Sequence, residues 1–242
     1  MQKKVGIKMS EDVQHALESS IVGPLAKDSL MDVAEYSIDE VFNNEIIKQI
    51  PIVKTVIGVI QTGINIHDRL FLKKIVAFLV GINHIPEKQR KKVVDKINSS
   101  KKYQMRVGEK LLYIIDKCDD YTNAENIAKL FSAMVKGDIS YEQYLEAPRV
   151  LARISTNDLN LFIQSYDSSS LSYEATSLLH TGLVSIDTEK PEVEVTKREP
   201  EYWGDSSEYY DSKVDGGEII PYPTKVGDVV FKVFGNKDKA KR

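Results

Sequence analysis

The densest group of chemically active side chains in this sequence is basic. Residues 86–106 carry eight lysines and arginines but only two acids, and such an excess attracts phosphate or anionic lipid headgroups. Val93, Val94 and Ile97 supply an apolar side to the same segment, so we favour a solvated helix face, and only Tyr103 is placed to stack on a base. The anion-binding candidates are Lys88, Arg90, Lys91, Lys92, Lys101 and Lys102.

A second group of residues points to protein recognition. Residues 187–218 hold eleven acids against four lysines and arginines, so this insert repels nucleic-acid phosphates. It also contains aromatic side chains of the kind that anchor protein interfaces. The alternative is that Trp203 folds back onto its own domain. The partner-binding candidates are Tyr202, Trp203, Tyr209 and Tyr210.

The sequence contains no residue pattern that indicates a metal site, a cofactor site or covalent catalysis. Aligning Gly137 with the turn glycine of a calcium-binding loop places Met134 and Lys136 at ligand positions, which excludes calcium. Cys118 is followed by two aspartates, which disfavour its thiolate. The sequence has neither a glycine-rich phosphate loop nor a G-x-S-x-G elbow. The four histidines lie far apart and none pairs with another ligand at i, i+4: His15, His67, His84 and His180. We therefore predict no metal, no cofactor and no enzymatic activity.

Composition sets the protein class. The chain has 242 residues, 42% hydrophobic content and a net charge of −3, which predicts a globular protein without a global attraction to nucleic acid or lipid. A single cysteine excludes an intramolecular disulfide framework and a multi-cysteine zinc site. No apolar run follows the charged N-terminus, so a secretory signal is not expected. These features predict a cytoplasmic protein.

Two apolar stretches, residues 50–60 and 70–82, are joined by a polar segment. They are the first of the elements that would position these residues. A helix of this length covers about 20 Å, less than the roughly 30 Å of a bilayer core. We therefore expect a buried helical hairpin. The alternative is an effector whose hairpin leaves the core and inserts into a membrane, with Lys73, Lys74 and the basic segment contacting headgroups.

The rest of residues 10–166 also has helical signals. Ser29 precedes an apolar stripe at spacings of three and four that continues to Ile47, which predicts one helix. Pro51 and Pro86 are placed to open helices. The fold class predicted here is mainly α, with an antiparallel array of about eight helices joined by short connections.

Local capping signals set several boundaries in this array. Residues 122–125 and 140–143 match the capping box, in which a hydroxyl and a carboxyl or amide satisfy each other's backbone donors. Gly137 lies between them, where a glycine closes a helix.

Residues 167–236 have a different pattern. A helix over residues 173–180 is followed by Gly182 and a short apolar run, and residues 193–196 and 217–222 alternate with period two. Thr224 is placed to cap a final helix. We predict a small β-ribbon with a long insert, and then a basic tail over residues 237–242.

This C-terminal order resembles the winged-helix pattern of many bacterial proteins. The resemblance depends on Leu178-Leu179-His180-Thr181-Gly182-Leu183-Val184 and on Tyr222-Pro223-Thr224-Lys225-Val226-Gly227. The chain is also similar to abortive-infection α-type proteins of phage defence, which end in such a Thr-x-x-Gly turn. The preceding block is similar to uncharacterised bacterial helical proteins. Its motifs are Asp68-Arg69-Leu70-Phe71-Leu72-Lys73-Lys74, Val107-Gly108-Glu109-Lys110-Leu111-Leu112 and Lys129-Leu130-Phe131. The resemblance implies a winged-helix-like α+β unit and a connection to phage defence.

Together these observations predict a helical domain over residues 1–166 and a winged-helix-like domain over residues 167–236. The expected function is a non-enzymatic bacterial interaction or regulatory module that holds a partner protein through its acidic, aromatic insert. Two alternatives remain open: a membrane-inserting effector that uses residues 50–82, and a nucleic-acid-binding regulator that uses the winged-helix unit, which the acidic insert disfavours.

Overall fold

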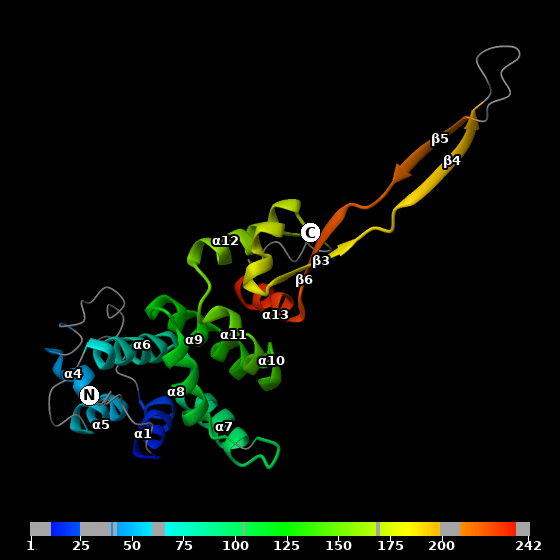
Figure 1. Ribbon diagram of the computed structural model, residues 1–242. Helices are drawn as coiled ribbons and strands as arrows, with labels where there is room; N and C mark the ends of the chain where they lie inside the picture. Colours follow the sequence, from blue (N-terminus) through cyan, green and yellow to red (C-terminus); the bar gives the residue numbers. More distant parts are fainter. Residues whose placement is uncertain are drawn as a thin grey trace, which may run out of the picture. The chain divides into compact units, whose positions relative to one another are not determined.

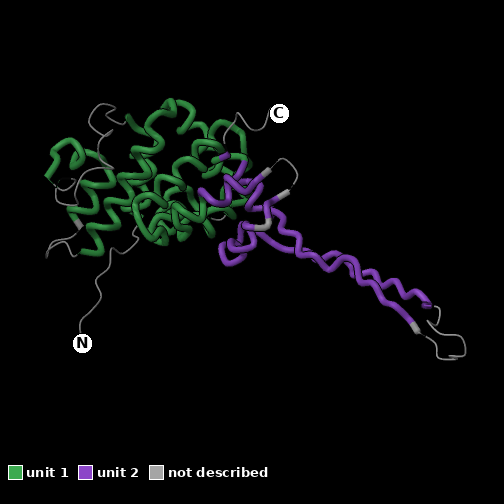
Figure 2. Tube along the Cα trace, turned by 90° about the horizontal axis from the view of Figure 1, so that it is seen from above, with its two compact units in different colours: residues 1–159, 232–234 green, residues 160–231, 235–242 purple. Residues whose placement is uncertain are grey.

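A computed structural model describes residues 11–24, 40, 43–59, 66–103, 105–167, 170–198 and 209–235. This part of the chain is mainly helical with a small C-terminal β region, which confirms the coarse fold class (Figure 1). The chain divides into two compact units, residues 1–159 with 232–234 and residues 160–231 with 235–242 (Figure 2). The division falls within helix α12 (Thr156–Ser165), close to the predicted change at residue 166.

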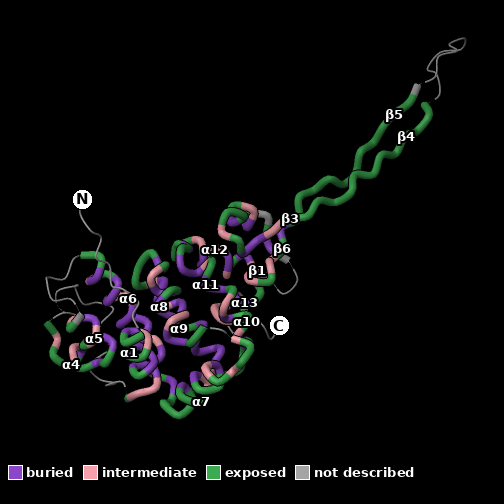
Figure 3. Tube along the Cα trace, turned by 60° about the horizontal axis from the view of Figure 1, so that its bottom comes forward, coloured by how far each residue is buried: buried purple, intermediate pink, exposed green. Residues whose placement is uncertain are grey.

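The first unit is built from short and medium-length helices. They are α1 (Glu11–Val22), α4 (Glu45–Lys48), α5 (Pro51–Val59), α6 (Ile66–Ile82), α7 (Glu87–Asn98), α8 (Val107–Lys117), α9 (Tyr121–Lys136), α10 (Tyr141–Glu146) and α11 (Pro148–Leu151). Figure 3 shows buried and exposed stretches alternating along these helices.

The described residues of the two apolar stretches are mostly buried, as predicted, although Leu70 is 46% exposed, but the two helices do not pack as a hairpin. Helix α5 lies against α1 and helix α6 against α9. The backbone N–H of Ile52 donates to Ser20 Oγ on α1 at 3.0 Å, so α1 satisfies a donor at the start of α5. On the other side, Phe78 of α6 meets Phe131 of α9 edge to face, with centroids 5.7 Å apart. Among the described residues, no helix is long and apolar enough to cross a membrane.

The capping predictions had mixed outcomes. Ser140 and Gln143 form the predicted capping box of α10, and Gly137 ends α9 in the left-handed conformation with φ 83°. The prediction for residues 122–125 was wrong, because Asp120 is the N-cap and Asn123 completes the box. Aspartate caps as well as threonine does, so the helix begins where the first good cap lies.

The single helix predicted up to Ile47 was also wrong at its C-terminal end. Asn44 has an extended backbone, and its side chain accepts hydrogen bonds from the N–H groups of Ile46 and Ile47, so a new helix, α4, begins at Glu45. Asparagine competes with the helix for backbone donors, which is why it starts α4 instead of continuing a longer one. The predicted residues 30–39 lie outside the described residues.

A buried carboxylate connects three helices of the first unit. Glu18 of α1 is 7% exposed and accepts hydrogen bonds from the N–H of Gly108, from Asn98 and from Arg106. Burial alone would raise the pKa of Glu18, but these hydrogen bonds and the Arg106 charge outweigh it and lower the pKa below 4.5. The network ties α1 to the end of α7 and the start of α8.

The second unit is organised around a helix, a strand pair and a final helix. Its first elements are the short strands β1 (Tyr166–Asp167) and β2 (Ser170–Leu171) and the 3₁₀ helix η1 (Tyr173–Thr181). Strands β3 (Val184–Thr188) and β6 (Ile219–Pro223) pair antiparallel, and α13 (Lys225–Phe234) follows.

Local capping fixes both ends of this arrangement. Gly182 ends η1 with φ 80°, and Thr224 Oγ1 accepts the N–H of Gly227 at the start of α13, both as predicted. The Tyr166 ring stacks on Phe231 of α13, and its hydroxyl donates to Asp228 at 2.8 Å. These two contacts connect β1 to α13.

Two further strands continue from β3 and β6. Strand β4 (Glu192–Arg198) pairs antiparallel with β5 (Tyr209–Asp215), and we call this pair the ribbon. Gly216 and Gly217 connect β5 to β6 with φ values of 84° and 80°, a conformation that only glycine adopts without strain. A Cβ on Gly216 would also lie 2.8 Å from the Lys190 carbonyl oxygen, so the close approach of the two connections requires glycine there.

Candidate protein-interaction surface

The ribbon has two chemically different faces. Directly opposed residues in an antiparallel pair lie on one face, and the faces alternate along each strand. Val193 opposes Val214, and Lys197 opposes Tyr210. Val195 lies between them on the same face, opposite a serine. This face therefore holds four apolar side chains, Val193, Val195, Tyr210 and Val214, together with Lys197 and Ser212, and we call it the apolar face.

The apolar face is uncovered in the part of the chain that the structure describes. Its four apolar side chains are exposed by 60%, 59%, 58% and 62% in sequence order. All described side chains of β4 and β5 are exposed, as Figure 3 shows along the whole ribbon. A two-stranded sheet is marginally stable in water on its own, and contiguous apolar surface marks interaction sites. The ribbon therefore has exposed apolar surface of the kind that marks interaction sites.

The opposite face is charged. Glu194 opposes Lys213, and Glu192 opposes Asp215. Lys213 Nζ also lies 2.6 Å from Asp215 Oδ2, and both side chains are well exposed. The ribbon is thus amphipathic, with water-compatible charges on one side and branched and aromatic side chains on the other.

The predicted aromatic anchors are only partly placed. Tyr202 and Trp203 lie outside the described residues, as does the side chain of Tyr209, whereas Tyr210 is exposed on the apolar face. Sequence reasoning missed the valines of this face. The period-two alternation at residues 193–196 predicted a strand correctly, but only the register of β4 against β5 shows that Val193 and Val214 form one surface.

The basic segment holds most of its predicted cations at the surface. Lys88, Lys91 and Lys92 on α7 are exposed, as are Lys101 and Lys102 in the following loop. This arrangement is that of a solvated helix face.

Arg90 is the exception, and its assignment to that face was wrong. It is 3% exposed, and its Nη2 donates to the Gly23 carbonyl oxygen at 2.9 Å. It lies on the same side of α7 as Val94 and Ile97, so helical periodicity turns it inward. Burial lowers the pKa of Arg90. Arg90 is therefore buried and contacts the backbone of its own chain at Gly23.

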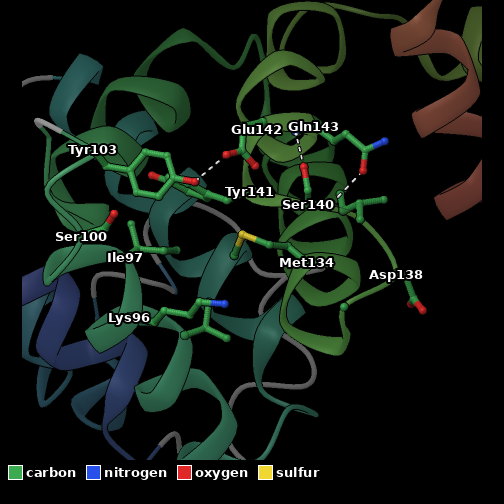
Figure 4. Close-up of a pocket in the computed structure, with 13 residues that line it drawn as sticks. Lys96, Ile97, Ser100, Tyr103, Met134, Asp138, Ser140, Tyr141, Glu142 and Gln143 are labelled. Atoms are coloured by element: carbon green, nitrogen blue, oxygen red, sulfur yellow. Dashed lines mark hydrogen bonds between the residues drawn. The ribbon is translucent and has the colours of Figure 1, made fainter.

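A pocket of about 670 Å³ lies beside the basic segment (Figure 4). Ile97 and Met134 contribute apolar surface, and Tyr103, Tyr141 and Glu142 contribute polar atoms. The full lining is Val93, Lys96, Ile97, Ser100, Tyr103, Met134, Gly137, Asp138, Ile139, Ser140, Tyr141, Glu142 and Gln143.

Several polar groups of this pocket already have hydrogen-bond partners. Tyr103 OH donates to Glu142 at 2.7 Å, and Lys102 also pairs with Glu142. These bonds lower the pKa of Glu142 to about 2. Ser140 and Gln143 are used in the capping box.

Cys118 is buried, at 3% exposure. Burial raises its pKa to about 12, and the nearby acids add to this effect against the opposing charge of Lys74. A thiol with such a pKa is unreactive near neutrality. Among the described residues, no three His, Cys, Asp or Glu side chains are grouped as metal ligands would be.

Comparisons with known proteins found no matching family model, no matching curated protein and no matching solved structure. The similarity to winged-helix units and to abortive-infection proteins therefore stays a prediction from the sequence.

Proposed function

We propose that this protein is a protein-interaction module and that the apolar face of the ribbon binds the partner. The observation that supports this proposal most strongly is the row of four exposed apolar side chains on a two-stranded sheet. Covering such a face removes apolar area from water and stabilises a ribbon that is marginal alone. Neither gain is available to the free protein.

The charge of the region favours a protein over nucleic acid or an anionic membrane. The insert of residues 187–218, which includes the ribbon, has eleven acids and four basic residues. Phosphates would meet like charge there. The expected partner surface is apolar at its centre and basic at its rim, since complementary charge steers association and disfavours wrong partners.

The order of η1, the β3–β6 pair and α13 is compatible with the winged-helix-like unit that the sequence resembles. In that interpretation β3 and β6 form the wing, and the ribbon lengthens it into a protein-binding arm. A regulatory role in phage defence would follow from the resemblance alone, and it is the narrower form of this proposal.

A pair of isosteric variants tests the proposal. Val193→Thr with Val214→Thr places hydroxyls at two opposed positions of the apolar face and keeps β-branched residues in both strands. Glu192→Gln with Asp215→Asn is the matched control, because these opposed residues lie on the charged face.

Each tagged protein is purified from its own cells, and the co-purifying proteins are quantified by mass spectrometry. We expect the threonine variant to lose a partner that the wild type and the control both retain, by about tenfold or more, since apolar centres dominate interface energetics. Equal recovery of every co-purifying protein by the two double variants would refute the role of the apolar face.

A further inference from the structure

The ribbon offers a second binding feature, which is the free edge of β5. In the described chain, β4 and β5 form a sheet of two strands, so each is hydrogen-bonded on one side only. The outward N–H and C=O groups of an edge strand are a template for another strand. Natural proteins protect such edges or use them for recognition.

We infer that β5 pairs antiparallel with β5 of a second copy of this chain, about a two-fold axis at Ser212. This inference rests on the proposed function, because it names one partner of the same ribbon. It uses the edge of β5, whereas the proposed function uses the apolar face.

The faces of the ribbon limit the possible registers. For the apolar faces of two copies to join, residues of the same face must be opposed across the new pair. The axis must therefore pass through a residue of β5 and not between two residues. The registers nearest the centre of the strand have their axes at Asp211, Ser212 and Lys213.

Charge selects one of these three registers. An axis at Asp211 opposes that aspartate to its own copy, and an axis at Lys213 opposes two lysines and also opposes Asp211 to Asp215. An axis at Ser212 instead opposes Asp211 to Lys213 of the second copy, twice by symmetry. Opposite charges directly across a strand pair stabilise it and like charges destabilise it.

The selected register also matches apolar side chains. It opposes Tyr210 to Val214 of the second copy, again twice, on the apolar face. The edge of β4 does not select one register in this way. Axes at Val195 and at Thr196 are equivalent, because each opposes a glutamate to Arg198 of the second copy and a valine to Lys197. Strand β5 therefore specifies one register, whereas β4 allows two.

Pairing would produce a four-stranded sheet in the order β4-β5-β5-β4. Such a sheet is large enough to be stable where a two-stranded one is marginal. The interface is isologous, as in most homodimers. It would also double the apolar face, because Val193, Val195, Tyr210 and Val214 of both copies would lie on the same side.

Charge reversal gives the decisive test. Asp211→Lys and Lys213→Asp each place like charges across the axis, so each variant alone is expected to dissociate at concentrations where the wild type is dimeric by analytical ultracentrifugation. An equimolar mixture of the two variants opposes lysines to aspartates at every site, and we expect it to associate at least tenfold more tightly than either variant alone. Any disturbance within a single ribbon is present both alone and in the mixture, so it does not affect this comparison.

A covalent test locates the axis. Ser212→Cys places two thiols opposite each other at the axis, within the separation that strand neighbours allow for a disulfide. Thr196→Cys on β4 is the control, and the native Cys118 is buried. Mild oxidation should convert most of the Ser212→Cys protein, and little of the control, to a dimer on a non-reducing gel.

The outcomes separate this inference from the proposed function. A wild type that stays monomeric, variants that do not associate when mixed, or equal cross-linking of both cysteine variants would overturn the pairing of β5. A second outcome is that the wild type is monomeric and captures a different protein, which the variant Val193→Thr with Val214→Thr no longer captures. The proposed function then stands, and a second copy is excluded as the partner. The inference is supported if the threonine variant still dimerises and if the mixture of Asp211→Lys and Lys213→Asp associates. This holds whether or not another protein is captured.

Discussion

Apolar side chains are mostly buried in the helical unit and exposed on the ribbon. Phe78 and Leu79 of α6 are fully buried against other helices, whereas Val193 and Val214 of the ribbon are about 60% exposed. An apolar residue in the first setting stabilises the fold, and in the second it is available to a partner. An apolar pattern therefore predicts that residues will be buried, but it does not show whether their own chain or a partner covers them.

The largest expected effect is in the helical core. Phe78→Ala should lower the free energy of unfolding by about 3–5 kcal/mol, because it removes buried ring contacts and leaves a cavity. The measurement is chemical denaturation followed by circular dichroism. Leu70→Ala on the exposed side of the same helix is the control and should cost under about 1 kcal/mol. Similar costs at both positions would contradict the assignment of the core.

The next effect concerns the buried carboxylate of Glu18, whose pKa is lowered in the folded state. A lowered pKa contributes stability that is present above the unfolded value of 4.5 and is lost as the pH falls through the folded pKa. Glu18→Gln should therefore cost about 1.5–3 kcal/mol at neutral pH, the value of hydrogen bonds to a charged group. Denaturation at pH 7 and pH 3 should show the difference between variant and wild type shrinking in acid. If the difference is equal at both pH values, Glu18 stabilises the fold through packing and not through its charge.

A smaller effect divides the basic helix α7 into two parts. Arg90→Gln removes the bond to Gly23 and should cost about 1–2 kcal/mol. The combined change of Lys88, Lys91 and Lys92 to glutamine should stay within about 0.5 kcal/mol. Thermal melts of both proteins test this difference. If the lysine variant is as unstable as the arginine variant, the exposed face has a structural role that the contacts do not reveal.

The smallest effect is expected where the exposed valines lie. Val193→Thr with Val214→Thr should change the unfolding free energy of the free protein by no more than about 0.5 kcal/mol per site, because little apolar area is buried there. The same denaturation experiment measures it. A loss comparable to that of Phe78→Ala would show that the ribbon's apolar face is covered by its own chain.

How far the sequence predicts this molecule depends on whether a signal is local. Ser140 with Gln143, Gly137 and Thr224 act within a few residues, and all three predictions were confirmed. Burial of most apolar residues in α5 and α6 follows from apolar content alone, but the packing of α5 and α6 against different helices depends on which helix each one meets. The burial of Arg90 depends on Gly23, 67 residues away.

The candidate site shows the same limit. The acidic charge and the aromatic residues of the insert are visible in the sequence, and the interaction surface that we propose lies in the same segment. The apolar face itself depends on the opposition of Val193 to Val214, which is set by the register across a long connection. A pattern within one strand does not contain that register.

Hydrogen–deuterium exchange of the native complex tests the central claim most directly. The protein is purified with whatever it binds, a second copy included, and its amide exchange is compared with that of the dissociated chain. We predict slower exchange across β4 and β5 in the complex, because a covered ribbon opens less often, and unchanged exchange in α5 and α6. Protection confined to α7 and the basic loop, with β4 and β5 exchanging as fast as in the free chain, would contradict the account.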